Sequence, residues 1–482
     1  MMPAVSKAEL DELKAKIGLE VHLELNTRTK MFCPCVNDSL ETHPNTNICP
    51  ICTGQPGALP SLNRQAVVST LKFIQSVGGA IQERSIFARK NYFYPDLPKG
   101  YQISQYESPL GVGGELVVDS ERSERIRIRR IHLEEDTGKL IHAIDSTLVD
   151  FNRSGVPLVE LVTEPDLASA EVARAFVEEL MLLIRYLNIS GANLERGEIR
   201  LEANISVGPG EALGTKVEVK NLNSIAALEG SIRYEIERHK EAIASGEKLI
   251  QETRGWDEAK QRTFSQRTKE EAEDYRYFPE PDLPPLVIDE TLRAEVILPE
   301  LPAAKRQRFQ TEFNLASTEA ANLVRQPELA NFFEEAVSEF QALNSGDTKL
   351  LYNYLANDLA GLLAKFGKAL ADLNLTPHTF GHLISLVAKG EFGSKMAKDI
   401  LLSVVERGED IEVLIRGTTK LSDEGALRSA IEAAIAANPK AVDDYRKGKG
   451  GSIEFLIGQV MKQTKGQADI ELTRRLLQEA LG

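Results

Sequence analysis

The stretch Ile17-Gly-Leu-Glu-Val-His-Leu-Glu-Leu25 alternates apolar and polar residues, with glycine as the one small exception. Successive side chains of a β-strand point to opposite faces. The apolar residues at 17, 19, 21, 23 and 25 therefore share one face, while Glu20, His22 and Glu24 share the other. This pattern predicts a strand that is buried on one side and carries acids and a histidine on the other.

Three later stretches, 157–164, 200–207 and 215–220, repeat this alternation. Their polar positions are Glu160 and Glu164; Arg200, Glu202 and Asn204; and Lys216, Glu218 and Lys220. Strands that alternate in this way are typical of antiparallel sheets with one buried face. The four stretches together predict a half-buried antiparallel sheet with one chemically dense face.

The chain is long enough for several domains, with 482 residues, 57 basic and 72 acidic, and a net charge of −15. A proline-rich stretch from 278 to 302 ends the segment in which strand and helix patterns are mixed. After it, apolar residues recur at helical spacing, as in Leu329, Phe332, Phe333, Ala336, Val337 and Phe340. We predict an α+β fold, with an α+β domain over 1–300 and two all-α domains over 301–408 and 409–482.

The composition also excludes some classes of protein. The polar, acidic opening residues lack the apolar core of a secretory signal, and no apolar run reaches the length of a membrane helix. We therefore expect a soluble, cytoplasmic protein with no membrane partner. The excess of acids argues against adhesion to nucleic acid over the whole surface, although a local basic face stays compatible with it.

All four cysteines, Cys33, Cys35, Cys49 and Cys52, lie within twenty residues. Two short cysteine pairs separated by a loop match a tetrahedral zinc site with four thiolate ligands. Two disulfides or free thiols are the alternative, and a reducing compartment disfavours disulfides. Four thiolates leave no open position, so we expect a structural Zn²⁺ that holds the 36–48 loop. No cysteine then remains to act as a catalytic nucleophile.

Carboxylates and a histidine on one sheet face suit Mg²⁺, with lysine and arginine among them to neutralise phosphoryl oxygens. The run His132-Leu-Glu-Glu-Asp136 adds further acids. A solvated polar face is the alternative for any single strand. The phosphate-binding loop motif G-x-x-x-x-G-K-[ST] is absent from the sequence, so we expect nucleotide binding in a cleft of the sheet.

Several runs resemble one family, the B subunit of the tRNA-dependent aspartyl/glutamyl-tRNA amidotransferase (GatB). They are Ile17–His22, Arg89–Asp96, Tyr101–Gln105, His132–Asp136, Glu218–Ser224, Tyr275–Asp282 and, in the tail, Phe455–Gly466. The resemblance covers nearly the whole chain. It implies a cradle domain with a fold like that of glutamine synthetase, a helical domain and a YqeY-like tail.

The resemblance also implies a ligase that acts in translation. ATP phosphorylates the side-chain carboxylate of Glu or Asp misacylated onto tRNA(Gln) or tRNA(Asn), and ammonia then displaces phosphate to give the amide. The implied partners are a glutaminase, the A subunit, which supplies the ammonia, and the small C subunit, in a heterotrimer. The sequence leaves open whether the glutamine route, the asparagine route or both operate.

The resemblance assigns roles to individual residues. It implies Mg²⁺ ligation by His22, Glu135 and Glu160. It implies that Glu20, Glu202 and Glu218 interact with metal and with the phosphates of ATP, although the family usually has aspartate at the position of Glu202. Candidate contacts to phosphate or carboxylate are Lys90, Arg153 and Lys220. Tyr92 and Tyr94 are candidates for stacking on adenine or on the terminal adenosine of tRNA, with burial in the core as the alternative.

The tail between 445 and 475 carries seven basic and three acidic residues. The candidate tRNA contacts there are Arg446, Lys447, Lys449, Lys462 and Lys465. Two other functions compete with this interpretation: a ligase or guanido-type kinase for a free small molecule, and a non-catalytic RNA-binding zinc protein. The basic tail disfavours the first alternative, and the acidic sheet face disfavours the second.

Overall fold

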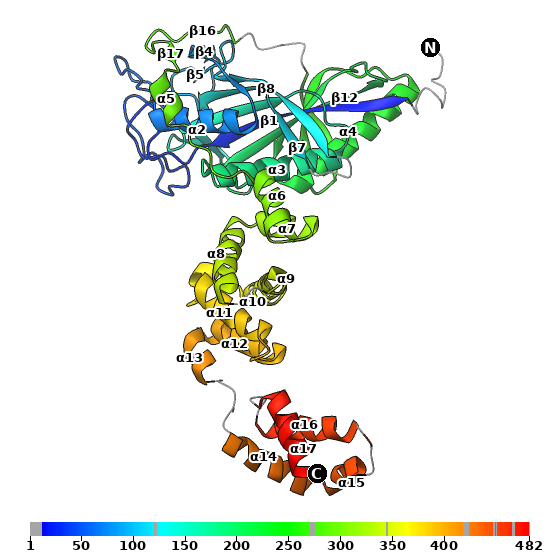
Figure 1. The fold of residues 1–482 in the computed structure, drawn as a ribbon. Coiled ribbons are helices and arrows are strands. Elements are labelled where there is room, and N and C mark those ends of the chain that lie inside the picture. The colour runs from blue at the N-terminus through cyan, green and yellow to red at the C-terminus, as the bar shows by residue number, and fades with distance from the viewer. Residues whose placement is uncertain are drawn as a thin grey trace. The chain divides into compact units, whose positions relative to one another are not determined.

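The computed structural model describes residues 12–118, 123–268, 275–343, 346–417, 424–446, 449, 451–464 and 468–481. The chain divides into two compact units, Met1–Leu301 and Pro302–Gly482. Figure 1 shows the mixed strands and helices of the first unit and the helices of the second. No helix within the described ranges has both the length and the apolar character needed to cross a membrane.

The first unit is built on a large sheet of 13 strands, whose main path runs β15-β14-β13-β12-β1-β11-β8-β5-β4-β16. Neighbouring strands on this path pair antiparallel, except that β13 and β14 pair parallel. The strands of the unit, two small two-stranded sheets included, are β1 (Leu13–Glu24), β2 (Ala80–Ile81), β3 (Arg84–Ser85), β4 (Ala88–Asn91), β5 (Tyr101–Ser104), β6 (Gly111–Val112), β7 (Glu115–Val118), β8 (Glu124–Glu135), β9 (Lys139–His142), β10 (Thr147–Asp150), β11 (Pro157–Thr163), β12 (Ile199–Pro209), β13 (Val217–Leu222), β14 (Glu252–Asp257), β15 (Arg262–Thr268), β16 (Phe278–Pro279) and β17 (Leu286–Val287).

Helices cover the apolar face of this sheet. The helices of the first unit are α2 (Arg64–Ser76), α3 (Ala170–Leu187), α4 (Ile225–Ser245) and α5 (Glu290–Ala294). Figure 1 shows α3 and α4 along the same side of the sheet. Ile17, Leu19, Val21 and Leu23 of β1 are at most 1 % exposed and share a core with residues of α3 and α4. The alternation predicted for β1 is therefore confirmed, and its polar face lies opposite the helices.

The second unit is helical throughout its described elements, which confirms the predicted α+β class for the whole chain. Its helices are α6 (Pro302–Glu312), α7 (Ser317–Val324), α8 (Pro327–Leu343), α9 (Thr348–Asn353), η1 (Tyr354–Leu359), α10 (Ala360–Phe366), η2 (Leu370–Asp372), α11 (Pro377–Ala388), α12 (Ser394–Arg407), α13 (Ile411–Gly417), α14 (Glu424–Ala437), α15 (Pro439–Arg446), α16 (Gly451–Gln463) and α17 (Ile470–Leu481). The six apolar residues predicted to line one helix face are all buried in α8.

The last four helices share a core of their own, which includes Leu427 of α14, Leu456 and Val460 of α16, and Leu477 of α17. This core is contiguous from α14 to α17, as expected of a small helical module. The division of the second unit at residue 408 stays a prediction.

A buried ionic cluster joins α4 to the edge of the sheet. Glu235 is fully buried and lies 2.7 Å from Arg238, 3.2 Å from Arg254 and 3.3 Å from His239. It also accepts a hydrogen bond from the hydroxyl of Thr263. Burial opposes ionisation, but the adjacent His239 and the hydrogen bonds from Arg238 and Thr263 lower the pKa of Glu235 from 4.5 to about 2.

We expect Glu235→Gln to lower the free energy of unfolding of the first unit by roughly 3 kcal/mol at pH 7, because it removes a buried negative charge that contacts Arg238 and Arg254. A carboxylate with a lowered folded-state pKa stabilises above its unfolded pKa, so the difference from wild type should shrink as the pH falls from 5 towards 2. Denaturation followed by the fluorescence of Trp256, the sole tryptophan, measures both effects. The exposed Glu237→Gln of the same helix is the control. Equal stabilities of Glu235→Gln and the control would contradict the assignment.

Candidate functional site

The polar face of the sheet is assembled by the register of its central strands. His22 of β1 lies opposite Glu160 of β11 and Arg200 of β12, and Glu160 lies opposite His132 of β8. Side chains at directly opposite positions share a face of the sheet and come into contact. Residues from strands more than a hundred positions apart in sequence therefore meet in one place.

His22 is the centre of an acidic cluster. Its Nε2 atom lies 3.3 Å from Glu134 Oε1, 3.6 Å from Glu160 Oε2 and 4.0 Å from Glu20 Oε1. One ligand atom each from His22, Glu134 and Glu160 lie within 4.8 Å of one another, and so do atoms of Glu20, His22 and Glu202. Ligand atoms on opposite sides of a Mg²⁺ ion are about 4.1 Å apart, so both groups have the dimensions of a cation site.

The charges in this cluster are poorly compensated by the protein alone. Burial, and then the neighbouring Glu160 and Glu202, raise the pKa of Glu20 to about 7. Burial disfavours a charged His22, but hydrogen bonds to Glu134 and Glu160 outweigh it and raise the pKa of His22. Neither ring nitrogen of the buried His132 has a hydrogen-bond partner among the described residues, and burial lowers the pKa of His132. A crowded carboxylate set of this kind is what a bound divalent cation would relieve.

The structure does not bring Glu135 to His22 and Glu160. Its carboxylate lies 2.5 Å from Lys99 Nζ and accepts a hydrogen bond of 3.0 Å from the N–H of Ile103. Glu134 and Glu135 are consecutive in β8, and consecutive side chains point to opposite faces of a sheet. The position that the resemblance gave to Glu135 is occupied by Glu134, and strand parity with His132 could have indicated this from the sequence.

A cavity of about 760 Å³ opens over this face. It is lined by the carboxylates of Glu20, Glu134, Glu160 and Glu218 and by the cations of Lys16, Lys90, Arg129, Arg130, Lys216 and Lys220. Two predicted residues lie beside the lining: His22 contacts Glu134, and Glu202 lies 2.8 Å from Lys220. The volume and the mixture of acids and bases suit a polyphosphate ligand together with its metal ions.

Lys90 and Lys220 hold positive charge within this cavity. Burial opposes the charged form of Lys90, but Glu134, Tyr277 and Glu160 raise the pKa of its ammonium group. In the same way, Glu202 and Glu218 outweigh the effect of burial and raise the pKa of Lys220 to about 12. Both side chains are therefore cationic at neutral pH, as a phosphate contact requires.

The aromatic residues of the cavity are not those predicted. Tyr106 and Tyr277 stack with their ring centres 5.0 Å apart, and Arg130 lies 4.2 Å from the ring of Tyr106. Lys90 lies 4.9 Å from the ring of Tyr275, and the rings of Tyr92 and Tyr277 each lie 6.1 Å from that ring. Tyr277 belongs to the Tyr275–Asp282 run, whose alternating tyrosines were a signal for this position.

Two other predicted residues lie away from this cavity's lining. Tyr94 is 58 % exposed beside a separate shallow pocket of the 93–100 segment. Arg153 donates to the carbonyl oxygens of Thr137 and Gly138 and lies 3.5 Å from Asp136. These contacts hold the side chain of Arg153 against the turn that follows β8.

The four cysteines converge as their spacing predicts. The Sγ atoms of Cys33, Cys35, Cys49 and Cys52 lie within 4.8 Å of one another, and those of Cys49 and Cys52 are 3.9 Å apart. The edge of a tetrahedron of sulfur ligands around zinc measures about 3.8 Å. The backbone N–H of Cys49 also donates to Cys52 Sγ at 3.2 Å. This cluster could bind a metal ion.

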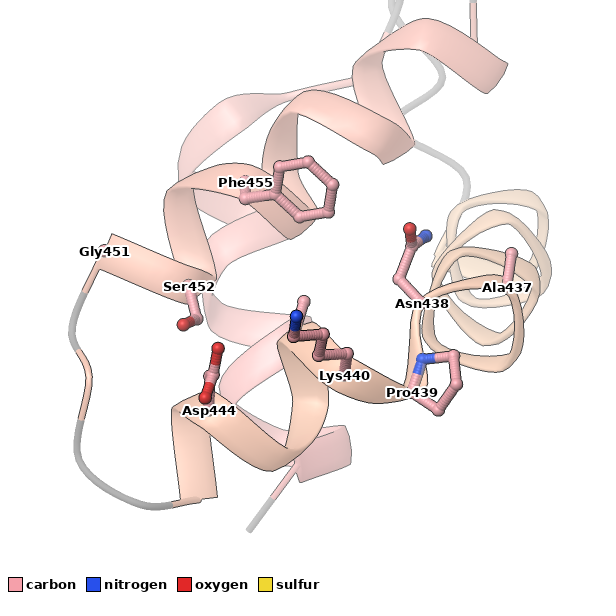
Figure 2. Close-up of a pocket in the computed structure, with 9 residues that line it drawn as sticks. Ala437, Asn438, Pro439, Lys440, Asp444, Gly451, Ser452 and Phe455 are labelled. Carbon is pink, nitrogen blue, oxygen red and sulfur yellow. The ribbon is translucent and has the colours of Figure 1, made fainter.

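The predicted tail contacts are partly described. Arg446, Lys449 and Lys462 are exposed, whereas Lys447 and Lys465 lie outside the described residues. A cavity of about 470 Å³ lies in the same tail region. Figure 2 shows Phe455 and Lys440 among the side chains that line it. Phe455 is 50 % exposed, so an aromatic ring and an ammonium group face the same opening.

Comparison with known proteins gives consistent matches. Residues 15–294 match the family model of the GatB/GatE catalytic domain, and residues 331–481 match that of the GatB domain. A relative from Thermus thermophilus is 48 % identical over 97 % of this chain and 99 % of its own length, and one from Thermomicrobium roseum is 47 % identical over 98 % and 99 %. Another from Rippkaea orientalis is 45 % identical over 99 % of both chains. All three are named as the B subunit of an aspartyl/glutamyl-tRNA(Asn/Gln) amidotransferase.

The contrast between two adjacent glutamates yields a test of the cation site. We expect Glu134→Gln to weaken Mn²⁺ binding, used as a probe for Mg²⁺, by at least about tenfold, because one anionic ligand is removed. Glu135→Gln is the matched control, since it removes an equally buried charge one residue away, and we expect less than about a threefold change. Electron paramagnetic resonance of free Mn²⁺ measures both constants. A weakening confined to Glu135→Gln would restore the assignment made from the resemblance.

Proposed function

Because the chain belongs to the GatB family of aspartyl/glutamyl-tRNA amidotransferase subunits, we propose that its sheet cavity activates the side-chain carboxylate of Glu or Asp carried by tRNA. The family membership makes the chain part of a glutamine-hydrolysing ligase. The observation that carries the proposal is the acidic cluster around His22, held beside Lys90 and Lys220 in one cavity.

The proposed reaction has two steps. A carboxylate oxygen of the aminoacyl group attacks the γ-phosphorus of ATP, the bond from that phosphorus to the β–γ bridging oxygen breaks, and ADP leaves. Ammonia then attacks the acyl carbon of the acyl phosphate, phosphate leaves with the electrons of the broken C–O bond, and a proton is released to give the amide. Activation is needed because a free carboxylate is a poor acyl donor.

Different residues of the cavity would have different roles in the first step. His22, Glu134 and Glu160, with Glu20, Glu202 and Glu218 beside them, would hold Mg²⁺, which when bound offsets negative charge on the phosphates. Lys90, Lys220 and Arg130 would contact phosphoryl or carboxylate oxygens directly. Stacked Tyr106 and Tyr277 offer an aromatic surface for a nucleobase, in place of the predicted Tyr92 and Tyr94.

Ammonia must reach this cavity from a partner. The sequence has neither a Ser-Ser-Lys amidase signature nor a cysteine outside the cluster of four. The relatives are named as B subunits, which implies other subunits in their enzymes. We therefore propose two partners in a cytoplasmic heterotrimer, a glutaminase (the A subunit) and the small C subunit.

The cysteine cluster would hold a structural zinc ion. All four sulfur ligands come from the protein, so no position is left for substrate. The hydroxyl of Ser154, in the segment that leads into β11, donates to the carbonyl oxygen of Cys52 at 3.1 Å. The ion would therefore fix the cysteine loop next to the strand that supplies Glu160.

The tail is proposed to bind the phosphates of tRNA(Gln) or tRNA(Asn). Arg446, Lys449 and Lys462 are exposed cations in a chain of net negative charge. Interactions of this kind position RNA without reading its sequence. Recognition of tRNA shape is therefore expected from this region.

Lys90→Met tests the role of the sheet cavity. With partner subunits, Glu-tRNA(Gln), ATP and glutamine, we expect amide formation to fall by about 100-fold or more, because one preorganised cation at the reacting phosphate is removed. Hydrolysis of glutamine by the partner should persist. Lys260→Met, an exposed lysine of the same unit, is the control. Amide formation by Lys90→Met equal to the control would count against the proposed site.

Neutralising the exposed tail cations tests the interaction with tRNA. We expect the triple change of Arg446, Lys449 and Lys462 to glutamine to weaken tRNA binding and to reduce its salt slope by roughly 0.7–0.9 for each phosphate interaction that is removed. The matched control neutralises three exposed lysines elsewhere in the second unit, Lys365, Lys389 and Lys395. Filter binding at several salt concentrations gives the slopes. Identical salt slopes of tRNA binding for the two triple variants would contradict the proposal that the tail binds tRNA.

A further inference from the structure

Lys30 is a fully buried lysine beside the cysteine cluster, with 0 % of its surface exposed. Its Nζ atom lies 2.7 Å from the carbonyl oxygen of Ser154, 3.4 Å from that of Phe151 and 3.9 Å from Cys52 Sγ. All three neighbours are acceptors. An ammonium group has three N–H donors and no lone pair, so these neighbours fit the charged form of the side chain.

The positive charge of Lys30 is not offset by a carboxylate of the described residues. None of them forms an ion pair with Lys30, and the nearby Glu135 is paired with Lys99. A buried ammonium group without an opposite charge is strongly unfavourable. Two carbonyl dipoles reduce this cost but supply no net negative charge. Among the described neighbours of the ammonium group, Cys52 Sγ is the atom that can carry a negative charge.

We propose that Lys30 is the counter-ion of the metal-bound cysteine cluster. Four thiolates around a divalent ion leave a net charge of about −2, which is itself unfavourable inside a protein. The ammonium group of Lys30 offsets part of that charge at 3.9 Å from Cys52 Sγ, where the backbone carbonyls of the 151–154 turn fix it. Lys30 is thus a positioning residue that acts through the thiolates and strengthens metal binding. The inference rests on the proposed zinc site.

A purely structural role for Lys30 makes a different prediction. Lys30 also ties the 151–154 turn to the cysteine loop, and removal of that link alone would destabilise the fold with or without metal. The hydroxyl of Ser154 offers a matched control, since it joins the same turn to Cys52 through a neutral hydrogen bond of 3.1 Å. Ser154→Ala removes this link and leaves the charge in place.

The test compares Lys30→Met with Ser154→Ala in the full-length chain. Zinc affinity is measured by competition with a chromophoric chelator under reducing conditions, after the zinc content of each purified protein has been determined. We expect Lys30→Met to bind zinc about 10–100-fold more weakly than wild type, the range found for groups that support metal ligands, and Ser154→Ala to change affinity less than about threefold.

Thermal unfolding supplies a second measurement. Lys30→Met should lower the midpoint of the zinc-loaded protein and should leave unchanged or raise that of the zinc-stripped protein, in which the ammonium group is without its counter-charge. An equal fall in both forms, or equal zinc affinities in Lys30→Met and wild type, would overturn the counter-ion role while the zinc site stands. Wild-type protein that binds no zinc would overturn both the site and this inference.

Discussion

The structure depends on the burial of one face of β1. Ile17, Leu19 and Val21 have almost no exposed surface, so the strand cannot shift by one residue without placing its acids in the core. The same constraint holds Glu20 and His22 on the opposite face, against β11 and β12. Packing of the apolar core thereby fixes the positions of the carboxylates on the opposite face, although these carboxylates repel one another.

Two charged centres of the first unit, around His22 and around Cys52, are balanced in different ways. Around His22 several carboxylates crowd together, and the lysines of the cavity offset only part of their charge. Around Cys52 a buried ammonium group lies beside sulfur atoms and is not paired with a carboxylate of the described residues. Around His22 a bound cation would reduce the excess of negative charge, and around Cys52 the thiolates of a metal-bound cluster would supply the negative charge that the ammonium group lacks. The Glu235 cluster, by contrast, is paired within the protein and can serve as a purely structural element.

The spacing of residues along the sequence was enough to predict the α+β class, the face shared by Glu20 and His22, and the convergence of the cysteines. Each of these features depends on residues that are close together in the chain. The parallel pairing of β13 with β14 was not among the predictions, although the α4 crossover between them is the usual connection of parallel strands. The position within the family motif indicated Glu135 as the Mg²⁺ ligand, whereas the alternation of side chains along β8 favours Glu134 for that role. Tyr106 lines the cavity and stacks on the distant Tyr277, a contact that no local pattern encodes.

The opposite environments of Glu134 and Glu135 make the site sensitive to strand length. A deletion of one uncharged residue in β8 ahead of these positions would move Glu135 to the place of Glu134 and Glu134 to that of Leu133, and the chain would keep its charge and nearly all of its composition. The carboxylate now beside Lys99 would then face His22, and its neighbour would point away. Insertions and deletions in this strand are therefore a greater hazard than most substitutions, and alignments through it should be judged by strand parity before residue type.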